Sequence, residues 1–156
     1  MRTSSTLEHI AQLKYDVLLL PGDLSYTNMR QTKWDNFGLL VQPLASKRPW
    51  MVTQGNYEVE KILKIHKRRF TSYNARWLMP YQESASPSNL LYCFQVAGAH
   101  VIMLGSYAGF ALDYPRYRWL KANLRKVDWK RTSCLVVVVH APWYKSNVAH
   151  QSEYAV

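Results

Sequence analysis

The strongest constraint on the fold is a set of three apolar segments that each lead into a polar side chain. They are DVLLL (16–20) before Asp23, WMVTQ (50–54) before Asn56, and LVVVV (135–139) before His140. DVLLL lacks polar alternation, which is typical of a strand covered on both faces of a sheet. In open α/β sheets, ligands bind outside the carboxyl ends of the strands. If these strands are parallel neighbours, Asp23, Asn56 and His140 gather along one edge.

The stretches between these segments predict helices, which places the chain in the α/β class. The predicted helices are 4–13, 31–44 (ending at Pro43), 59–70 and 114–127 (with Pro115 in its first turn). Residues 89–96 and 100–107 predict an antiparallel hairpin that turns at Gly98. The run CLVVVV (134–139) predicts a central strand because it is rich in β-branched residues. A length of 156 residues suits one domain with a real core.

The charge of the chain favours anionic partners, since the formal net charge is +10. Part of this charge lies in KILKIHKRRF (61–70), which is either a solvated helix face or a polyanion-binding patch. Binding of single-stranded nucleic acid uses interleaved aromatic residues for base stacking, and this run has only Phe70. Nucleic acid is therefore not the expected partner.

Cysteine content and hydropathy exclude several other classes. Cys93 and Cys134 both lie in apolar stretches, so we expect two buried thiols and neither a disulfide framework nor a CxxC metal site. No apolar run reaches 18 residues, so no membrane span is predicted. Residues 1–10 lack the apolar region of a signal peptide.

The donor types at the three strand ends indicate a metal site. A carboxylate, an amide oxygen and an imidazole suit a transition-metal ion better than calcium or a thiolate zinc site. Each residue also has a simpler interpretation. Asp23 would be a turn residue after Pro-Gly, Asn56 would take a left-handed position beside Gly55, and His140 would be a hydrogen-bonded core histidine. Their joint placement favours the metal site.

Three motifs in order carry a resemblance to a known family. GDLSY (22–26) resembles the GDxxY motif of the purple acid phosphatases, within the metallophosphoesterase superfamily. GNYE (55–58) resembles their GNH[DE] motif, and VVVHAPWY (137–144) resembles their VxxH motif. The intervening text, such as YNARWLMPYQES (73–84), is similar to the large plant-type members. The resemblance covers nearly the whole chain.

This resemblance implies a βαβαβ metallophosphoesterase sandwich with mixed sheets and a two-metal centre at the strand ends. The ions it implies are Fe(III) and a second ion, which is Fe, Zn or Mn. By motif matching, Asp23 would bridge both ions and Tyr26 would bind the ferric ion as a phenolate. Asn56 and His140 would bind the second ion. The simpler interpretation of Tyr26 is a packed surface tyrosine.

The resemblance also implies a reaction, the hydrolysis of phosphate monoesters at acidic pH. Asn56, Tyr57 and His150 match positions that contact the substrate phosphate, and His150 would also assist the leaving group as the catalytic residue. The simpler interpretation of His150 is an exposed loop histidine. The family further implies a secreted or vacuolar location, and it leaves a homodimer open.

Departures from the family pattern lead to two alternatives. The GDxG and GHxH motifs are not found, so residues 1–156 are expected to form a partial calcineurin-like metallophosphoesterase domain. Tyr57 stands where the family has a histidine, and a neutral phenol carries no positive charge. One alternative is a non-catalytic remnant that binds a single divalent metal or phosphate. The other is a basic polyanion-binding module.

Overall fold

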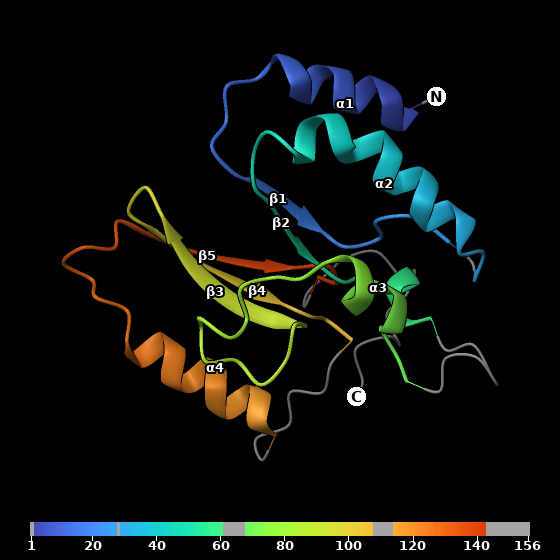
Figure 1. Cartoon of the computed structure of the whole chain (residues 1–156). Helices are drawn as coiled ribbons and strands as arrows, with labels where there is room; N and C mark the ends of the chain where they lie inside the picture. Colours follow the sequence, from blue (N-terminus) through green and yellow to red (C-terminus); the bar gives the residue numbers. More distant parts are fainter. Residues whose placement is uncertain (1, 28, 61–67, 108–113, 143–156) are drawn as a thin grey trace.

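The computed structural model describes residues 2–27, 29–60, 68–107 and 114–142, and it shows a mixed α/β fold with two β-sheets (Figure 1). In chain order the elements are α1 (Arg2–Gln12), β1 (Leu18–Pro21), α2 (Thr32–Ala45), β2 (Trp50–Thr53), the 3₁₀ turn η1 (Tyr57–Val59), α3 (Thr71–Arg76), β3 (Leu91–Val96), β4 (Ala99–Leu104), α4 (Pro115–Arg125) and β5 (Cys134–Val139).

The first sheet brings two of the predicted polar strand ends to the same edge. β1 and β2 are parallel, with Leu18 opposite Trp50 and Pro21 opposite Thr53. Helix α2 connects the two strands, and α1 lies along α2 on the outer side (Figure 1). Because the strands are parallel and in register, the residues that follow Pro21 and Thr53 leave the sheet side by side.

The second sheet has the order β3-β4-β5. β3 and β4 form the predicted antiparallel hairpin, and its two turn residues, Ala97 and Gly98, have φ angles of 48° and 79°. Two positive φ values are the signature of a type I′ turn, which matches the twist of paired strands. β5 runs parallel to β4 and contacts β1. The end of β5 therefore approaches the end of β1.

Apolar side chains of β4 alternate between two cores, as the two-residue period of a strand requires. Val101 and Met103 join a cluster that includes Trp34 of α2 and Val52 of β2. Ile102 and Leu104 face the other way and pack against Trp119 of α4. The second sheet thus packs against β2 and α2 on one side and against α4 on the other (Figure 1).

The structure corrects several predicted boundaries. Helix α2 does not end at Pro43 but continues to Ala45, because Pro43 lies in the last turn and removes only one intrahelical bond there. The predicted helix 59–70 falls mostly on residues 61–67, outside the described part of the chain. Its described ends are not α-helical: Val59 closes η1, and residues 68–70 form a turn before α3, which the sequence did not predict.

Strand β5 is not a central strand within the described sheets. It pairs with β4 only and lies at the edge of its ladder, and Val137 is 43% exposed. The prediction of two buried thiols is also wrong. Cys93 is half-buried, but Cys134 is exposed because it is the first residue of this edge strand. None of the described helices is long and apolar enough to cross a membrane.

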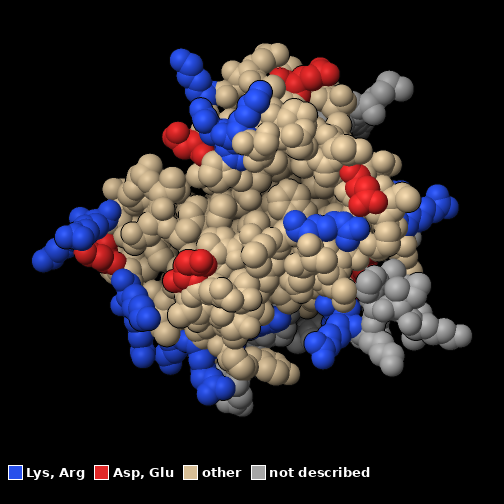
Figure 2. Space-filling view, viewed as in Figure 1, with Lys and Arg blue, Asp and Glu red and all other residues tan. Residues whose placement is uncertain are grey.

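Positive side chains are spread over the molecule. On the face in Figure 2, Lys and Arg occupy several separate regions, with Asp and Glu among them. The basic run 61–67 lies outside the described residues, while Arg68 and Arg69 are exposed. The face in Figure 2 therefore shows no single continuous basic patch.

Candidate metal centre

The exit of β1 places the Asp23 carboxylate through an unusual backbone path. Gly22 and Asp23 both have left-handed φ angles, 87° and 54°, and Tyr26 has a φ of 47°. Non-glycine residues rarely adopt this region, and such conformations cluster at functional sites. Asp23 lies in the loop that follows β1, and its carboxylate accepts the Tyr57 N–H at 3.2 Å.

The exit of β2 runs against the exit of β1 at a pair of glycines. A Cβ on Gly55 would lie 2.6 Å from the Asp23 backbone nitrogen and 2.8 Å from His140 Cε1, so no side chain fits there. Asn56 follows with a φ of −68°, in the right-handed helical region. The left-handed interpretation of Asn56 is therefore wrong, and the residue begins η1 with its side chain facing Asp23 and His140.

Groups from neighbouring elements hold His140 in place at the end of β5. Its N–H donates to Ser106 Oγ at 3.0 Å, and Ser106 lies just beyond β4. Its Nδ1 lies 2.6 Å from the carbonyl oxygen of Pro21, the last residue of β1. A carbonyl can only accept, so Nδ1 carries the proton and Nε2 of the neutral ring keeps a lone pair. In metal sites, a histidine ligand commonly donates its other ring N–H to a carbonyl or carboxylate in the same way, which fixes the orientation of the ring.

Three lone-pair donors therefore converge on one point. His140 Nε2 lies 3.2 Å from Asn56 Oδ1 and 3.6 Å from Asp23 Oδ1. The three come from the ends of three different strands, as the sequence predicted. Lone pairs that face one another in this way repel unless a proton or a cation lies between them.

The Asn56 amide shows how the cluster is satisfied with and without a cation. With its oxygen inward, the amide adds an oxygen ligand to a carboxylate and an imidazole, a set that fits a divalent transition ion. With the amide turned, its nitrogen donates to His140 Nε2 at 3.2 Å and to the Asp23 oxygens at 3.1 and 3.3 Å. The residues thus fit a cation, and the amide can replace it by hydrogen bonds when none is bound.

Tyr26 lies beside this cluster but is more exposed, at 52%. Its ring packs on the Tyr57 ring, with centroids 4.6 Å apart. Desolvation first, and the neighbouring Asp23 carboxylate second, raise the pKa of Tyr26 above its usual value. The simpler interpretation, a packed surface tyrosine, describes its ring contact but not its approach to Asp23.

Two positioning contacts were missed by sequence reasoning. Glu58 is 1% exposed and accepts the N–H groups of Asp23, Leu24 and Gly55. Burial raises the pKa of Glu58, and these three backbone bonds oppose that shift. Glu58 lies three residues after Gly55, the spacing at which a Glu side chain reaches back to a backbone N–H in a capping box, although Gly55 lacks the side chain that would complete the motif. Ser106 carries no such spacing signal, since its partners are the N–H groups of His140 and Ala141, which follow β5.

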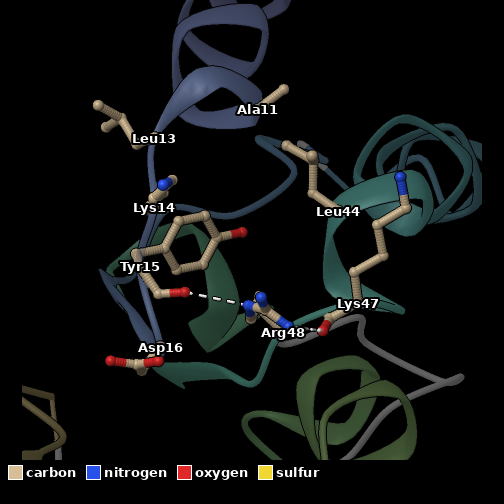
Figure 3. Close-up of a pocket in the computed structure, with 8 residues that line it drawn as sticks. All are labelled: Ala11, Leu13, Lys14, Tyr15, Asp16, Leu44, Lys47 and Arg48. Carbon is tan, nitrogen blue, oxygen red and sulfur yellow. Dashed lines mark hydrogen bonds between the residues drawn. The ribbon is translucent and has the colours of Figure 1, made fainter.

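A large hollow lies at the opposite end of the first sheet. It measures about 730 Å³ and is lined by residues that precede β1 and β2, including Asp16 and Arg48 (Figure 3). Arg48 Nε donates to the Tyr15 carbonyl, while the Lys47 side chain extends away from it (Figure 3). These cations do not converge, so we do not assign this hollow to the site.

The sequence of the chain matches a known protein family. The family model of the calcineurin-like phosphoesterases matches residues 2–156. The chain belongs to the calcineurin-like phosphoesterase family. This family membership explains why the polar residues lie at strand ends, and it implies a dinuclear metal centre.

Relatives of this phosphoesterase chain are plant purple acid phosphatases. It is 60% identical over 151 residues to "Probable purple acid phosphatase 20" of Arabidopsis thaliana and 62% identical to "Purple acid phosphatase 18" of the same plant. Both alignments cover 97% of this chain. The chain spans about a third of the length of these relatives, 35% and 34%.

A solved structure supports the fold of the phosphoesterase chain. A purple acid phosphatase from yellow lupin (Lupinus luteus) seeds matches with a TM-score of 0.71 over 86% of this chain and 24% of that chain. Its sequence identity is 18%, so the match concerns the fold alone.

The described residues hold only part of the ligand set that the phosphoesterase family implies. No group of three or more His, Cys, Asp or Glu side chains gathers within the described ranges, since the cluster uses one Asp and one His with an Asn. His150 lies outside the described residues. The roles of Asp23, Tyr26, Asn56 and His140 as ligands, and of Tyr57 and His150 as substrate contacts, stay predictions.

Proposed function

We propose that this chain supplies the central strand-end ligands of a phosphomonoesterase of the purple acid phosphatase type. The observation that carries the proposal is the convergence of Asp23, Asn56 and His140 Nε2, with the proton of His140 held on Nδ1 by Pro21. The high identity to named purple acid phosphatases supports the reaction class.

In this proposal Asn56 and His140 hold a divalent ion, which is Fe, Zn or Mn. Asp23 would be a ligand of both that ion and a ferric ion, and Tyr26 would be a further ligand of the ferric ion. Bound metal would supply positive charge to the phosphoryl group and activate water for attack. The protein's part is to hold these donors rigidly at the strand ends, in a partly buried setting where side chains of Asp23 and His140 are 12% and 21% exposed.

Tyr57 and His150 would complete the contacts to a phosphate monoester. Tyr57 follows Asn56 directly, and its ring is fixed against Tyr26. Its phenol can donate one hydrogen bond to a phosphate oxygen but adds no positive charge. We therefore expect weaker stabilisation of the transferring phosphoryl group than a histidine would give, and we assign protonation of the leaving group to His150.

Hydrolysis of p-nitrophenyl phosphate at acidic pH, with added iron and zinc, tests the proposed reaction. The proposal predicts turnover that is lost in His140→Ala. Because His140 is only partly buried and lies after β5, this variant should stay folded by circular dichroism. Turnover no higher than that of His140→Ala would contradict the proposed activity of this chain.

The remaining assignments follow the family. We propose that residues 1–156 form part of a metallophosphoesterase domain in a secreted or vacuolar protein. Assembly as a homodimer stays a prediction.

A further inference from the structure

Glu58 is a buried carboxylate whose partners all belong to the two loops that follow β1 and β2. Its Oε2 accepts the N–H groups of Asp23 and Gly55, each at 2.7 Å, and its Oε1 accepts the Leu24 N–H at 2.8 Å. The side chain is 1% exposed. Among the described residues, no cationic side chain forms an ion pair with it.

A carboxylate in such a place is costly unless its oxygens are well paired. Here three backbone donors pair them, and in return the carboxylate satisfies three N–H groups that no strand ladder uses. One of these donors belongs to Asp23 itself, and another belongs to the residue before Asn56. The same carboxylate therefore ties the exit of β1 to the exit of β2.

The hydrogen bonds to Glu58 also stabilise a left-handed backbone conformation that Asp23 would not adopt readily. The φ of Asp23 is 54°, and its own N–H and the next one along the chain both point to Glu58. Strained conformations persist only where the surroundings over-determine them. Without this anchor, the Asp23 carboxylate would sample other directions relative to Asn56 and His140.

We propose that Glu58 is a positioning residue that sets the spacing of Asp23 and Asn56 and thereby the affinity of the centre for its cation. The inference rests on the proposed function, since it concerns the same centre. Glu58 contacts no substrate and no ion itself. It acts through the backbone of the two loops.

Glu60 offers a matched control only two residues away. It is also a buried carboxylate, 7% exposed. Its acceptor contacts are to side chains outside the cluster: Thr27 Oγ1, Gln31 Nε2 at 3.3 Å and Trp34 Nε1 at 3.4 Å. Glu60→Gln should therefore disturb a buried polar network without moving the two loops.

The experiment is calorimetric titration of the whole chain with zinc, for the unsubstituted protein, Glu58→Gln and Glu60→Gln. In Glu58→Gln, the amide nitrogen replaces one of the two carboxylate oxygens. In either orientation this nitrogen, itself a donor, faces at least one backbone N–H, so at least one hydrogen bond is lost. We expect zinc affinity to fall about 10- to 100-fold, as for other residues that orient metal ligands. Glu60→Gln should bind zinc within about twofold of the unsubstituted chain.

Amide hydrogen exchange of the metal-free variants gives a second readout that does not depend on zinc. The N–H groups of Asp23, Leu24 and Gly55 should lose protection in Glu58→Gln and keep it in Glu60→Gln. If Glu58→Gln does not fold, Glu58→Asp replaces it, and its shorter carboxylate should weaken zinc binding to a smaller extent.

The outcomes separate the two proposals. Equal zinc affinity in the unsubstituted chain and in a folded Glu58 variant would overturn the positioning role and leave the metal centre standing. Absence of zinc binding by the unsubstituted chain would overturn the proposed centre, and the role of Glu58 with it. Equal loss of affinity in the Glu58 and Glu60 variants would show general destabilisation and would also overturn the positioning role.

Discussion

Gly55 lies where the loops that follow β1 and β2 pack tightly against each other. An added Cβ would lie 2.6 Å from the Asp23 nitrogen and 2.8 Å from His140 Cε1. We predict that Gly55→Ala lowers the free energy of unfolding by about 1–3 kcal/mol, because neighbouring backbone must shift. It should also weaken zinc binding by pushing Asp23 and His140 apart. Urea unfolding and calorimetry measure the two effects.

Gly38 provides the control for this substitution. It lies in α2, where a Cβ added to it would meet no other atom within 4 Å. Gly38→Ala should raise the free energy of unfolding by roughly 0.5–1 kcal/mol, since alanine favours the helix. If the Gly55→Ala and Gly38→Ala variants had equal free energies of unfolding, the close packing of the two loops would be contradicted.

The two cysteines should differ in reactivity. Cys134 is exposed, whereas Cys93 is half-buried. Burial raises the pKa of Cys93, so a smaller fraction of this thiol is thiolate at a given pH. The rate at which Cys93 reacts should therefore keep rising to higher pH than the rate of an ordinary thiol. We predict that Cys134 reacts first with a disulfide reagent, with Cys93→Ser and Cys134→Ser assigning the phases. A faster phase lost in Cys93→Ser would contradict this.

Residues at strand ends were predictable, and residues that hold them were not. Asp23, Asn56 and His140 could be placed because each follows an apolar run, although only β1 and β2 are neighbours in one sheet and β5 reaches the site from the other sheet. Ser106 and Pro21 hold His140 through contacts between residues 34 and 119 positions apart in the chain. Nothing in a single sequence pairs such distant residues. The left-handed φ of Tyr26 could not be predicted from the sequence either, because this conformation depends on contacts with distant residues.

At the scale of elements, α4 is fastened to the second sheet by Asn123. Its Nδ2 donates to Cys93 Sγ of β3 at 2.8 Å, and its Oδ1 lies 2.8 Å from His100 Nε2 of β4. His100 Nδ1 is buried with no partner among the described residues. Removal of Asn123 would therefore leave a buried ring with both nitrogens unpaired.

We predict that Asn123→Ala lowers the free energy of unfolding by about 1–3 kcal/mol, the cost of an unsatisfied buried group. Lys121→Ala, on the exposed side of the same helix, should change it by less than about 0.5 kcal/mol. Urea denaturation compares the two variants. Equal stabilities would show that apolar packing of Trp119 alone holds α4.

Periodicity predicted most of the elements, and it failed where packing overrides local preference. The hairpin of β3 and β4 was predictable because Gly98 separates two apolar runs. The end of α2 was not, because Pro43 is tolerated in a last turn where few bonds remain to be lost. Helix α3 has only six residues, and buried Tyr73, which donates to the Val52 carbonyl, stabilises it more than its own sequence does.

At the scale of the whole molecule, we predict that the edge of the second sheet promotes self-association. β5 pairs only with β4 in the described sheets, and Val137 is 43% exposed on it. Lysine on an edge strand opposes pairing with another chain. We predict that Val137→Lys reduces self-association in sedimentation velocity. Leu39→Lys adds the same charge at a 75% exposed site on α2 and should have a smaller effect. An equal effect of both would indicate net charge, and not the strand edge, as the cause.

The central claim is that Asp23, Asn56 and His140 form a cation site, and nitrogen NMR of the imidazole rings tests it most directly. Without metal, we predict a proton on Nδ1 of His140 and none on Nε2. One equivalent of zinc should shift the Nε2 signal of His140 and leave His100 unchanged, and Asp23→Asn should weaken that response. A His140 ring protonated on Nε2, or unmoved by zinc while other histidines respond, would contradict the account.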